Sequence, residues 1–293
     1  MESYAMTTTL RHYKISIDGV VQSFHIAGKG PVCLVHPGGP GFNWNYMRMP
    51  LLEQTMTVVY IEPIGTGDSG LLQDGDYSMP RYAYFAHKIA EHIGAEKPCF
   101  LGHSHGGFAG IQYALDYPNE LGGLILHSSA PCMVPELGME QTRQIKLYAE
   151  RWPDRPEAQA ACQAWMDLGA GAAQDNESFL ELLGRLLPAF FGNYWNLPKE
   201  FEEWRDNLNF YLVPRNPHTW DAREVLDAID VPTLILVGEH DFNCGPRWAA
   251  EMDDKMPNSQ LHTFEAGGHM SHVESPEEFV KVVSDFVRHV RSA

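Results

Sequence analysis

Short runs of consecutive apolar residues recur along the chain, and each ends in a polar or glycine-rich loop. Runs of this kind predict strands that are buried on both faces, as in a parallel sheet. Five of them occur, at residues 32–35, 57–61, 99–101, 124–126 and 233–237. Residues 13–27 instead alternate between apolar and polar around Asp18-Gly19, which predicts an opening antiparallel hairpin.

Amphipathic patterns between these runs predict helices at residues 82–93, 108–115, 247–256 and 276–290. Alternating strands and helices favour an α/β fold, a mostly parallel sheet with helices on both faces. The pattern changes between residues 131 and 220, where five tryptophans and several prolines accompany helical stretches without a strand-like run. We therefore expect a core of residues 1–131 and 221–293, and an inserted helical cap of residues 132–220.

The segment 102–106 contains the pattern G-x-S-x-G between a predicted strand and a predicted helix. In that context a sharp strand-to-helix turn exposes the serine at the top of the sheet, and the glycines relieve crowding. Ser104 is therefore the predicted nucleophile.

A serine nucleophile needs a base and an orienting carboxylate. His269 follows the glycine pair after a strand-like segment and is the favoured base, with His272 as its rival and expected at the surface or as a helix cap. Asp241 follows the last long apolar run and is the favoured acid, with Glu239 as its rival. The order serine, aspartate, histidine is that of the α/β-hydrolase fold, which we predict for this chain.

The loop after the first apolar run, at residues 36–41, occupies the position that supplies an oxyanion-hole amide in this fold. Proline has no N–H, so Gly39 is the favoured donor there, with Gly38 also possible. The amide of His105, directly after the nucleophile, is the expected second donor. Residues 65–70 match G-x-G-x-x-G, but no helical pattern follows directly, so a rim loop is expected rather than a nucleotide site.

These motifs resemble the proline iminopeptidase group of α/β hydrolases. Residues 36–41 (HPGGPG) are similar to its HGGPG, residues 62–69 to its DQRGxGxS, and residues 241–246 to its D-x-x-C-P. The resemblance implies a hydrolase with a helical cap that covers the site. In that group a W-x-x-W-E motif in the cap supplies a glutamate for the substrate's free amine. Here only Trp165 of that motif is present, and Asp167 stands at a different offset.

Aromatic residues of the cap are candidates for a substrate pocket, namely Trp165, Phe190, Phe191, Tyr194 and Trp195. The predicted function is a serine hydrolase that cleaves an ester, lactone or amide bond of a small molecule through an acyl-enzyme. Three hypotheses remain open: a carboxylesterase or lactonase, an aminopeptidase of the iminopeptidase type, and a non-catalytic ligand-binding protein on a hydrolase fold. The triad needs no metal and no organic cofactor.

The formal net charge of −17 disfavours nucleic acid and anionic membranes as partners. No stretch of about 18 apolar residues occurs, and the N-terminus lacks the pattern of a secretory signal. The five cysteines are widely spaced and suggest neither a zinc site nor a disulfide framework. A cytoplasmic protein with a small-molecule substrate is expected, and its oligomeric state is left open.

Overall fold

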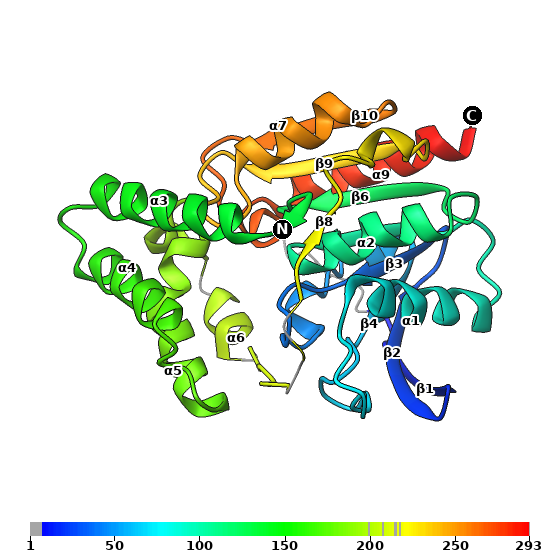
Figure 1. Cartoon of the computed structure of the whole chain (residues 1–293). Helices are drawn as coiled ribbons and strands as arrows, with labels where there is room; N and C mark the ends of the chain where they lie inside the picture. The colour runs from blue at the N-terminus through cyan, green and yellow to red at the C-terminus, as the bar shows by residue number, and fades with distance from the viewer. Residues whose placement is uncertain (1–7, 199, 207, 214–215, 217, 293) are drawn as a thin grey trace.

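An eight-stranded sheet forms the centre of the computed structural model, which describes residues 8–292 except 199, 207, 214–215 and 217 (Figure 1). Residues 1–7 of the predicted core lie outside this range. The strand order is β1-β2-β4-β3-β5-β6-β9-β10. The strands are β1 (Arg11–Ile17), β2 (Val20–Gly28), β3 (Val32–His36), β4 (Thr57–Ile61), β5 (Cys99–His103), β6 (Gly123–His127), β9 (Thr233–Gly238) and β10 (Ser259–Phe264).

The first two strands form the predicted antiparallel hairpin, and β2 also pairs antiparallel with β4. From β4 to β10 the neighbouring strands run parallel. Parallel strands all end at the same edge, so the loops after β3, β5, β9 and β10 meet there. The prediction of a mostly parallel sheet is confirmed.

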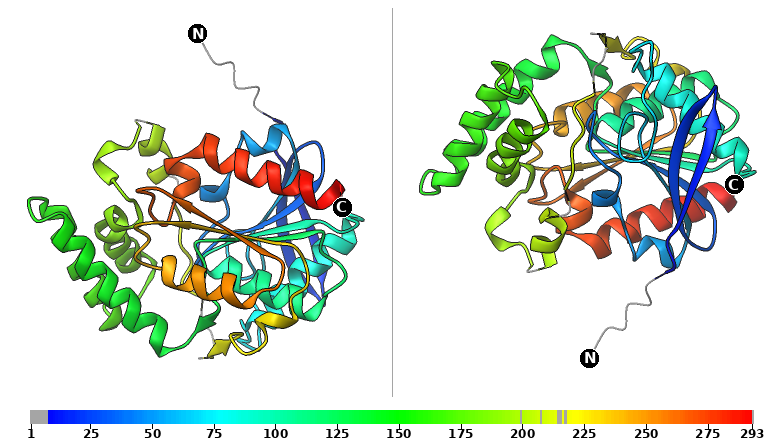
Figure 2. Two further views of the ribbon diagram at one scale, coloured as in Figure 1. Left: turned by 90° about the horizontal axis from the view of Figure 1, so that it is seen from above. Right: turned by 90° about the horizontal axis from the view of Figure 1, so that it is seen from below.

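Helices cover both faces of the sheet, which explains why its strands are continuously apolar. Figure 2 shows α9 on one side and α1, α2 and α7 on the other. Leu34 of β3 packs in the hydrophobic cluster of α1, α2 and α7, whereas its neighbours Cys33 and Val35 pack in the cluster that contains α9. The bounds are α1 (Met79–His92), α2 (His105–Asp116), α7 (Pro246–Lys255), α8 (Ser271–Glu274) and α9 (Pro276–Ser292). Short 3₁₀ turns lie in connecting loops at Asn45–Met47, Leu52–Gln54 and Leu226–Ala228.

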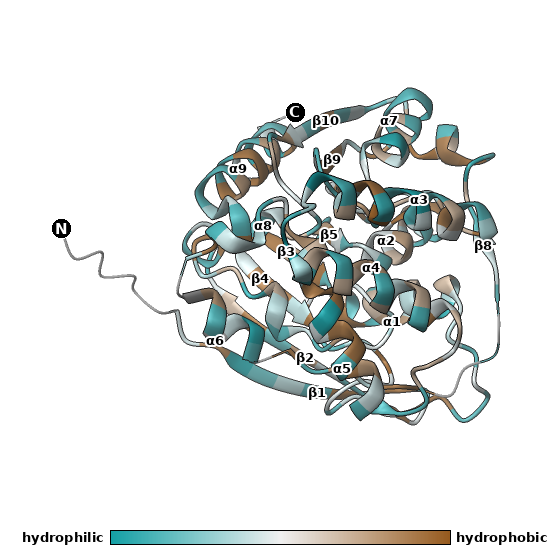
Figure 3. Ribbon diagram, turned by 90° about the vertical axis from the view of Figure 1, so that its left-hand side faces the viewer, coloured by the Kyte–Doolittle hydropathy of each residue, from teal (hydrophilic) through white to brown (hydrophobic). Residues whose placement is uncertain are grey.

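The predicted insertion is helical and lies over one end of the core (Figure 1). It begins after β7 (Cys132–Met133) and ends at β8 (Trp220–Asp221), two short strands that pair antiparallel with each other. Between them lie α3 (Pro135–Arg151), α4 (Pro156–Gly169), α5 (Asn176–Leu186), α6 (Glu200–Asp206) and 3₁₀ turns at Leu187–Phe190 and Tyr194–Asn196. Figure 3 shows α5 with a hydrophobic and a hydrophilic side, as expected for a helix that packs along one face.

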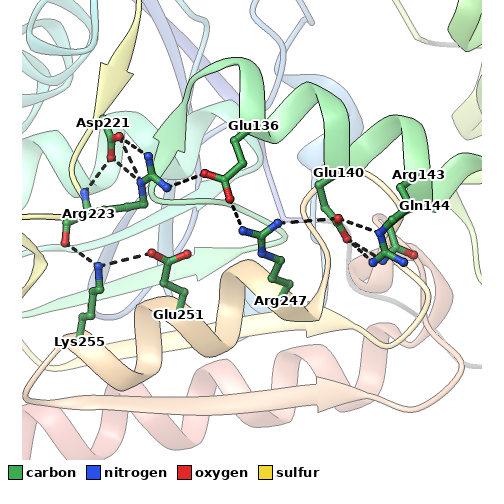
Figure 4. A network of polar contacts seen from close by, with 9 residues as sticks. All are labelled: Glu136, Glu140, Arg143, Gln144, Asp221, Arg223, Arg247, Glu251 and Lys255. Atoms are coloured by element: carbon green, nitrogen blue, oxygen red, sulfur yellow. Dashed lines mark hydrogen bonds and ion pairs between the residues drawn. The ribbon is translucent and has the colours of Figure 1, made fainter.

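Ion pairs join the cap to the core along α3 and α7 (Figure 4). Glu136 of α3 pairs with Arg223, next to β8, at 2.8 Å and also contacts Arg247 of α7. Arg247 lies 3.8 Å from Glu140, one turn further along α3. Among the described residues, no helix is both long and apolar enough to cross a membrane.

Candidate active site

Ser104 sits in a sharp turn between β5 and α2. Its backbone angles are φ 53° and ψ −120°, a strained combination for a residue other than glycine. A Cβ on Gly102 would meet the Gly106 carbonyl oxygen at 2.2 Å, and a Cβ on Gly106 would meet the His36 carbonyl oxygen at 2.1 Å. Only glycine fits at either position, so the G-x-S-x-G pattern has a steric cause here.

Asp241 lies in the loop after β9 and His269 in the loop after β10, and their side chains form a buried pair. The His269 Nδ1 lies 2.9 Å from Asp241 Oδ2 and 3.0 Å from Oδ1. The Asp241 carboxylate also accepts hydrogen bonds from the backbone N–H groups of Asn243 at 2.8 Å and Cys244 at 3.0 Å. These donors hold a negative charge that is only 2% exposed, so Asp241 can orient the imidazole with its Nε2 as the proton acceptor.

The Ser104 hydroxyl contacts the Cys244 thiol, and burial raises the pKa of that thiol well above its ordinary value. The His269 Nε2 lies 3.3 Å from the Asn243 Nδ2. In the described part of the chain no hydrogen bond joins Nε2 to the Ser104 hydroxyl. Catalytic hydrogen bonds are often loose before substrate binds, so the arrangement is compatible with a triad in its resting state.

The two rival residues lie elsewhere. His272 is buried in α8, and its Nε2 lies 3.2 Å from the Tyr46 carbonyl oxygen. The interpretation of His272 as a surface or capping residue is therefore wrong, because the last helices pack this ring into the core. The exposed Glu239 accepts a hydrogen bond from the backbone of Ala266 at 2.9 Å, in the loop before His269.

A hydrogen-bonded chain joins the glycine loop to the loop of the base. The Gly38 N–H donates to Tyr46 Oη at 2.5 Å, Tyr46 Oη lies 2.7 Å from His103 Nδ1, and His103 Nε2 lies 3.0 Å from the His269 carbonyl oxygen. A carbonyl only accepts, so His103 Nε2 carries the proton and Tyr46 donates to Nδ1. Burial and the neighbouring histidines hold the pKa of His103 well below its ordinary value, which keeps the ring neutral.

These hydrogen bonds limit which amides are available to the oxyanion hole. The amide of Gly38 is committed to Tyr46, so Gly39 is the remaining glycine donor before Pro40. Gly39 has φ +137°, a conformation that favours glycine. His105 is the first residue of α2, so its amide lies at the positive end of that helix. The sequence did not point to Tyr46 or His103, because Tyr46 lies outside the motifs and His103 occupies a variable position of G-x-S-x-G.

Glu274 connects the cap to the loop of the base. Its carboxylate accepts hydrogen bonds from the backbone N–H of Gly192 at 2.7 Å and of Gly268 at 2.6 Å. Burial raises the pKa of this carboxyl group, while the backbone donors oppose that change. Gly268 directly precedes His269, so the position of the base is coupled to the cap.

A narrow cavity of about 50 Å³ opens at Ser104, between the core and the cap. Its core wall contains the glycine loop and the side chains of Ser104 and His269, and its cap wall is apolar. The lining residues are Gly38, Gly39, Phe42, Tyr46, His103, Ser104, Leu183, Leu187, Phe190, Leu208, Asn243, His269 and Met270. None of these lining residues carries a carboxylate.

Of the five predicted pocket aromatics, only Phe190 lines this cavity. Phe191 is fully buried among Tyr194, Phe201 and Trp204. Trp165 packs edge-on against Phe242, and Trp195 packs against Trp152. Phe191 is thus buried inside the cap, and the half-buried Trp165, Tyr194 and Trp195 pack against other aromatic rings instead of lining the cavity.

Two further patterns can be placed. The glycine-rich loop 65–70 is followed by turns, and the next described helix, α1, begins only at Met79, so no helix N-terminus meets a phosphate there. His12, His25 and Glu62 have ligand atoms within 4.8 Å of one another. However, the two imidazole rings stack at 4.4 Å and 11°, so their in-plane lone pairs run side by side and do not converge on one ion.

Fold and site together define a hydrolase of the α/β type, with the serine on the turn after β5 and the acid and base on later loops. Residues 31–276 match the alpha/beta hydrolase fold family, and the chain belongs to it. The chain is 29% identical to a proline iminopeptidase of Lactobacillus helveticus over 273 residues, which cover 88% of this chain and 90% of that one. It is thus a distant homologue of the proline iminopeptidases, which agrees with the resemblance of its motifs.

Two solved structures share the fold. Proline iminopeptidase of Mycobacterium smegmatis superposes with a TM-score of 0.71 at 20% identity, over 96% of this chain and 98% of that one. A thermophilic esterase of Thermogutta terrifontis superposes with a TM-score of 0.70 at 23% identity, over 96% and 99%. At these identities the likeness supports the fold and leaves the substrate open.

Proposed function

We propose that the chain is a serine hydrolase that cleaves a carboxylic ester or lactone with a small apolar acyl group. Ser104 attacks the carbonyl carbon, and His269 takes the hydroxyl proton and returns it to the leaving oxygen. Asp241 holds the imidazole in the required tautomer. The amides of Gly39 and His105 stabilise the oxyanion, and water then hydrolyses the acyl-enzyme by the same route.

The observation that carries the ester or lactone preference is the composition of the cavity. Its lining residues offer aliphatic and aromatic side chains from the cap and N–H donors from the core, and no carboxylate. A protonated amine that enters this site loses its hydration and gains no charged partner, which is unfavourable. A neutral apolar acyl group gains from burial against Leu183, Leu187 and Phe190.

An aminopeptidase of the iminopeptidase type is the second candidate, and the full-length homology to proline iminopeptidases favours it. Such an enzyme needs an acceptor for the free amine of its substrate. Asp167, which could in principle serve, instead pairs with Arg185 at 3.3 Å within the cap and does not line the cavity. Amine binding at the described residues would therefore require a rearrangement of the cap.

A substrate panel separates these candidates. The wild-type protein is assayed with p-nitrophenyl butyrate, γ-butyrolactone and proline p-nitroanilide under the same conditions. We expect turnover of the butyrate ester or the lactone, with kcat/KM at least about 100-fold above that for the prolyl anilide, the size of a lost charge-assisted interaction. Turnover of the prolyl anilide alone would reverse the order of the two candidates. Turnover of none would favour a ligand-binding protein.

A further inference from the structure

Asn243 lies in the loop after β9, two residues after Asp241, and its side chain lines the cavity beside the base. Its Nδ2 lies 3.3 Å from His269 Nε2, and its Oδ1 accepts a hydrogen bond from Gln141 Nε2 at 2.5 Å. Gln141 belongs to the cap helix α3. One carboxamide therefore touches both the cap and the nitrogen that must receive the serine proton.

Contacts at both ends determine which side of the Asn243 amide faces the cavity. His269 Nδ1 donates to the Asp241 carboxylate, so Nε2 of the neutral ring carries a lone pair and requires a donor. The NH₂ group of Asn243 supplies that donor, while its oxygen faces the NH₂ group of Gln141. Beside His269, the Asn243 side chain thus offers N–H donors to the cavity and no hydrogen-bond acceptor.

We propose that Asn243 is a specificity-determining residue that donates to the leaving group and selects leaving atoms that accept a hydrogen bond. The inference rests on the proposed serine hydrolase function and extends it to the leaving-group side. His269 Nε2 returns the proton to the leaving atom, so that atom must come within hydrogen-bond reach of Nε2. The Asn243 amide is adjacent to the same point.

The amide changes partner in the course of the reaction. In the resting site it donates to Nε2; when Ser104 engages Nε2, its N–H becomes available to the leaving atom. The oxygen of an oxoester or lactone accepts this hydrogen bond. The sulfur of a thioester is a weak acceptor, and the nitrogen of an amide presents its own N–H, so neither gains as much.

The test compares two substrates that differ in the leaving atom alone, phenyl butyrate and S-phenyl thiobutyrate. For Asn243→Ala we expect kcat/KM for the oxoester to fall about two- to tenfold, the worth of one neutral hydrogen bond, with the thioester unchanged. For Asn243→Asp, where an acceptor faces the leaving oxygen, we expect the ratio of oxoester to thioester kcat/KM to fall further. For Gln141→Leu, which frees the amide to rotate, we expect a smaller fall in the same ratio.

Two matched controls use residues outside the site. Gln144 lies on the same helix and donates to Glu140 instead of the acid loop, so Gln144→Leu should leave the ratio unchanged. Asn258 donates to the Asp230 carbonyl far from the cavity, so Asn258→Asp should also leave it unchanged. Equal losses on both substrates in Asn243→Ala, or no loss on either, would overturn the inference. Failure of the wild type on both esters would instead contradict the proposed function itself.

Discussion

The core and the cap of this molecule differ in how they contribute to the site. The core supplies each polar group of the proposed chemistry from the loops at one edge of its sheet, and buried hydrogen bonds hold those groups in place. The cap supplies apolar walls, of which Leu183, Leu187 and Phe190 reach the cavity. Its contacts with the core include apolar packing such as Trp165 on Phe242, partly exposed ion pairs, the Glu274 link and the hydrogen bond from Gln141 to Asn243.

On the proposed function, the core carries the reaction, and the cap with its contacts sets the choice of substrate. This division also explains how distant relatives can share the core motifs while the amine-binding motif of the cap is absent here. Changes in the core should therefore remove the reaction, and changes at the cap surface should leave it nearly intact.

The largest effect is expected for Ser104→Ala. Loss of the nucleophile should lower kcat for p-nitrophenyl butyrate by about 10⁴–10⁶. The fold should survive, because the backbone of the turn is retained, and thermal denaturation followed by circular dichroism checks this. The control is Ser284→Ala on α9, which should keep full activity. A loss smaller than about tenfold would mean that the chemistry is not performed by the core as described.

An intermediate effect concerns the stability of the core at acidic pH. Burial lowers the pKa of His36 and of His272 from 6.5 to about 4, and holds those of His103 and His127 well below their ordinary value. The unfolded chain takes up these protons near pH 6.5 and the folded chain does not. The contribution of these neutral histidines to the free energy of unfolding is therefore fully present above pH 6.5. It falls as the pH decreases toward 4, by about 1.4 kcal/mol per pH unit for each such histidine.

Urea denaturation at pH 7.5, 6.5, 5.5 and 5.0 measures this dependence. In His272→Asn the slope of unfolding free energy against pH should decrease by about 1.4 kcal/mol per pH unit, the contribution of one proton, whatever the variant's overall stability. His289→Asn is the control for the substitution itself, because this side chain is exposed on α9. A free energy of unfolding that stays constant from pH 6.5 to 5.0 would show that the core histidines are not held neutral.

The smallest effect is expected for Glu136→Ala, at the boundary of cap and core. Its partners Arg223 and Arg247 are partly exposed, so the loss of unfolding free energy, measured by urea denaturation, should be small. We expect kcat/KM for p-nitrophenyl butyrate to stay within about twofold of wild type. The exposed Glu181→Ala on α5 serves as the comparison. A large loss of activity would mean that these ion pairs, and not the buried contacts, position the cap.

Much of the fold followed from local patterns. Strands buried on both faces are apolar without interruption, and the amphipathic helices between them were located to within a few residues. Local patterns could not predict the strand order. β4 lies between β2 and β3 in the sheet, and such pairings depend on contacts between residues distant in sequence. The short strands β7 and β8 were also missed, since two residues carry no periodicity.

The candidate site divides in the same way. Ser104, Asp241 and His269 stand in motifs at the ends of strands, so the sequence places them, and in the structure the aspartate and histidine make contact. The cavity wall could not be predicted, because Leu183 of α5 and Leu187 of the turn after it look like the other apolar residues of the cap. Of the aromatic rings predicted there, only Phe190 lines the cavity, and the other four pack against neighbouring rings. The only sequence feature that points to Asn243 is its polar side chain close to Asp241.

The central claim is that Ser104 is the nucleophile. A fluorophosphonate probe reacts with an activated serine, and mass spectrometry of the digested protein identifies the modified residue. We predict one label, on the peptide that contains Ser104, and no label in Ser104→Ala or after prior incubation with a slowly hydrolysed ester. A label on a different serine, or none on the folded wild-type protein, would contradict the account.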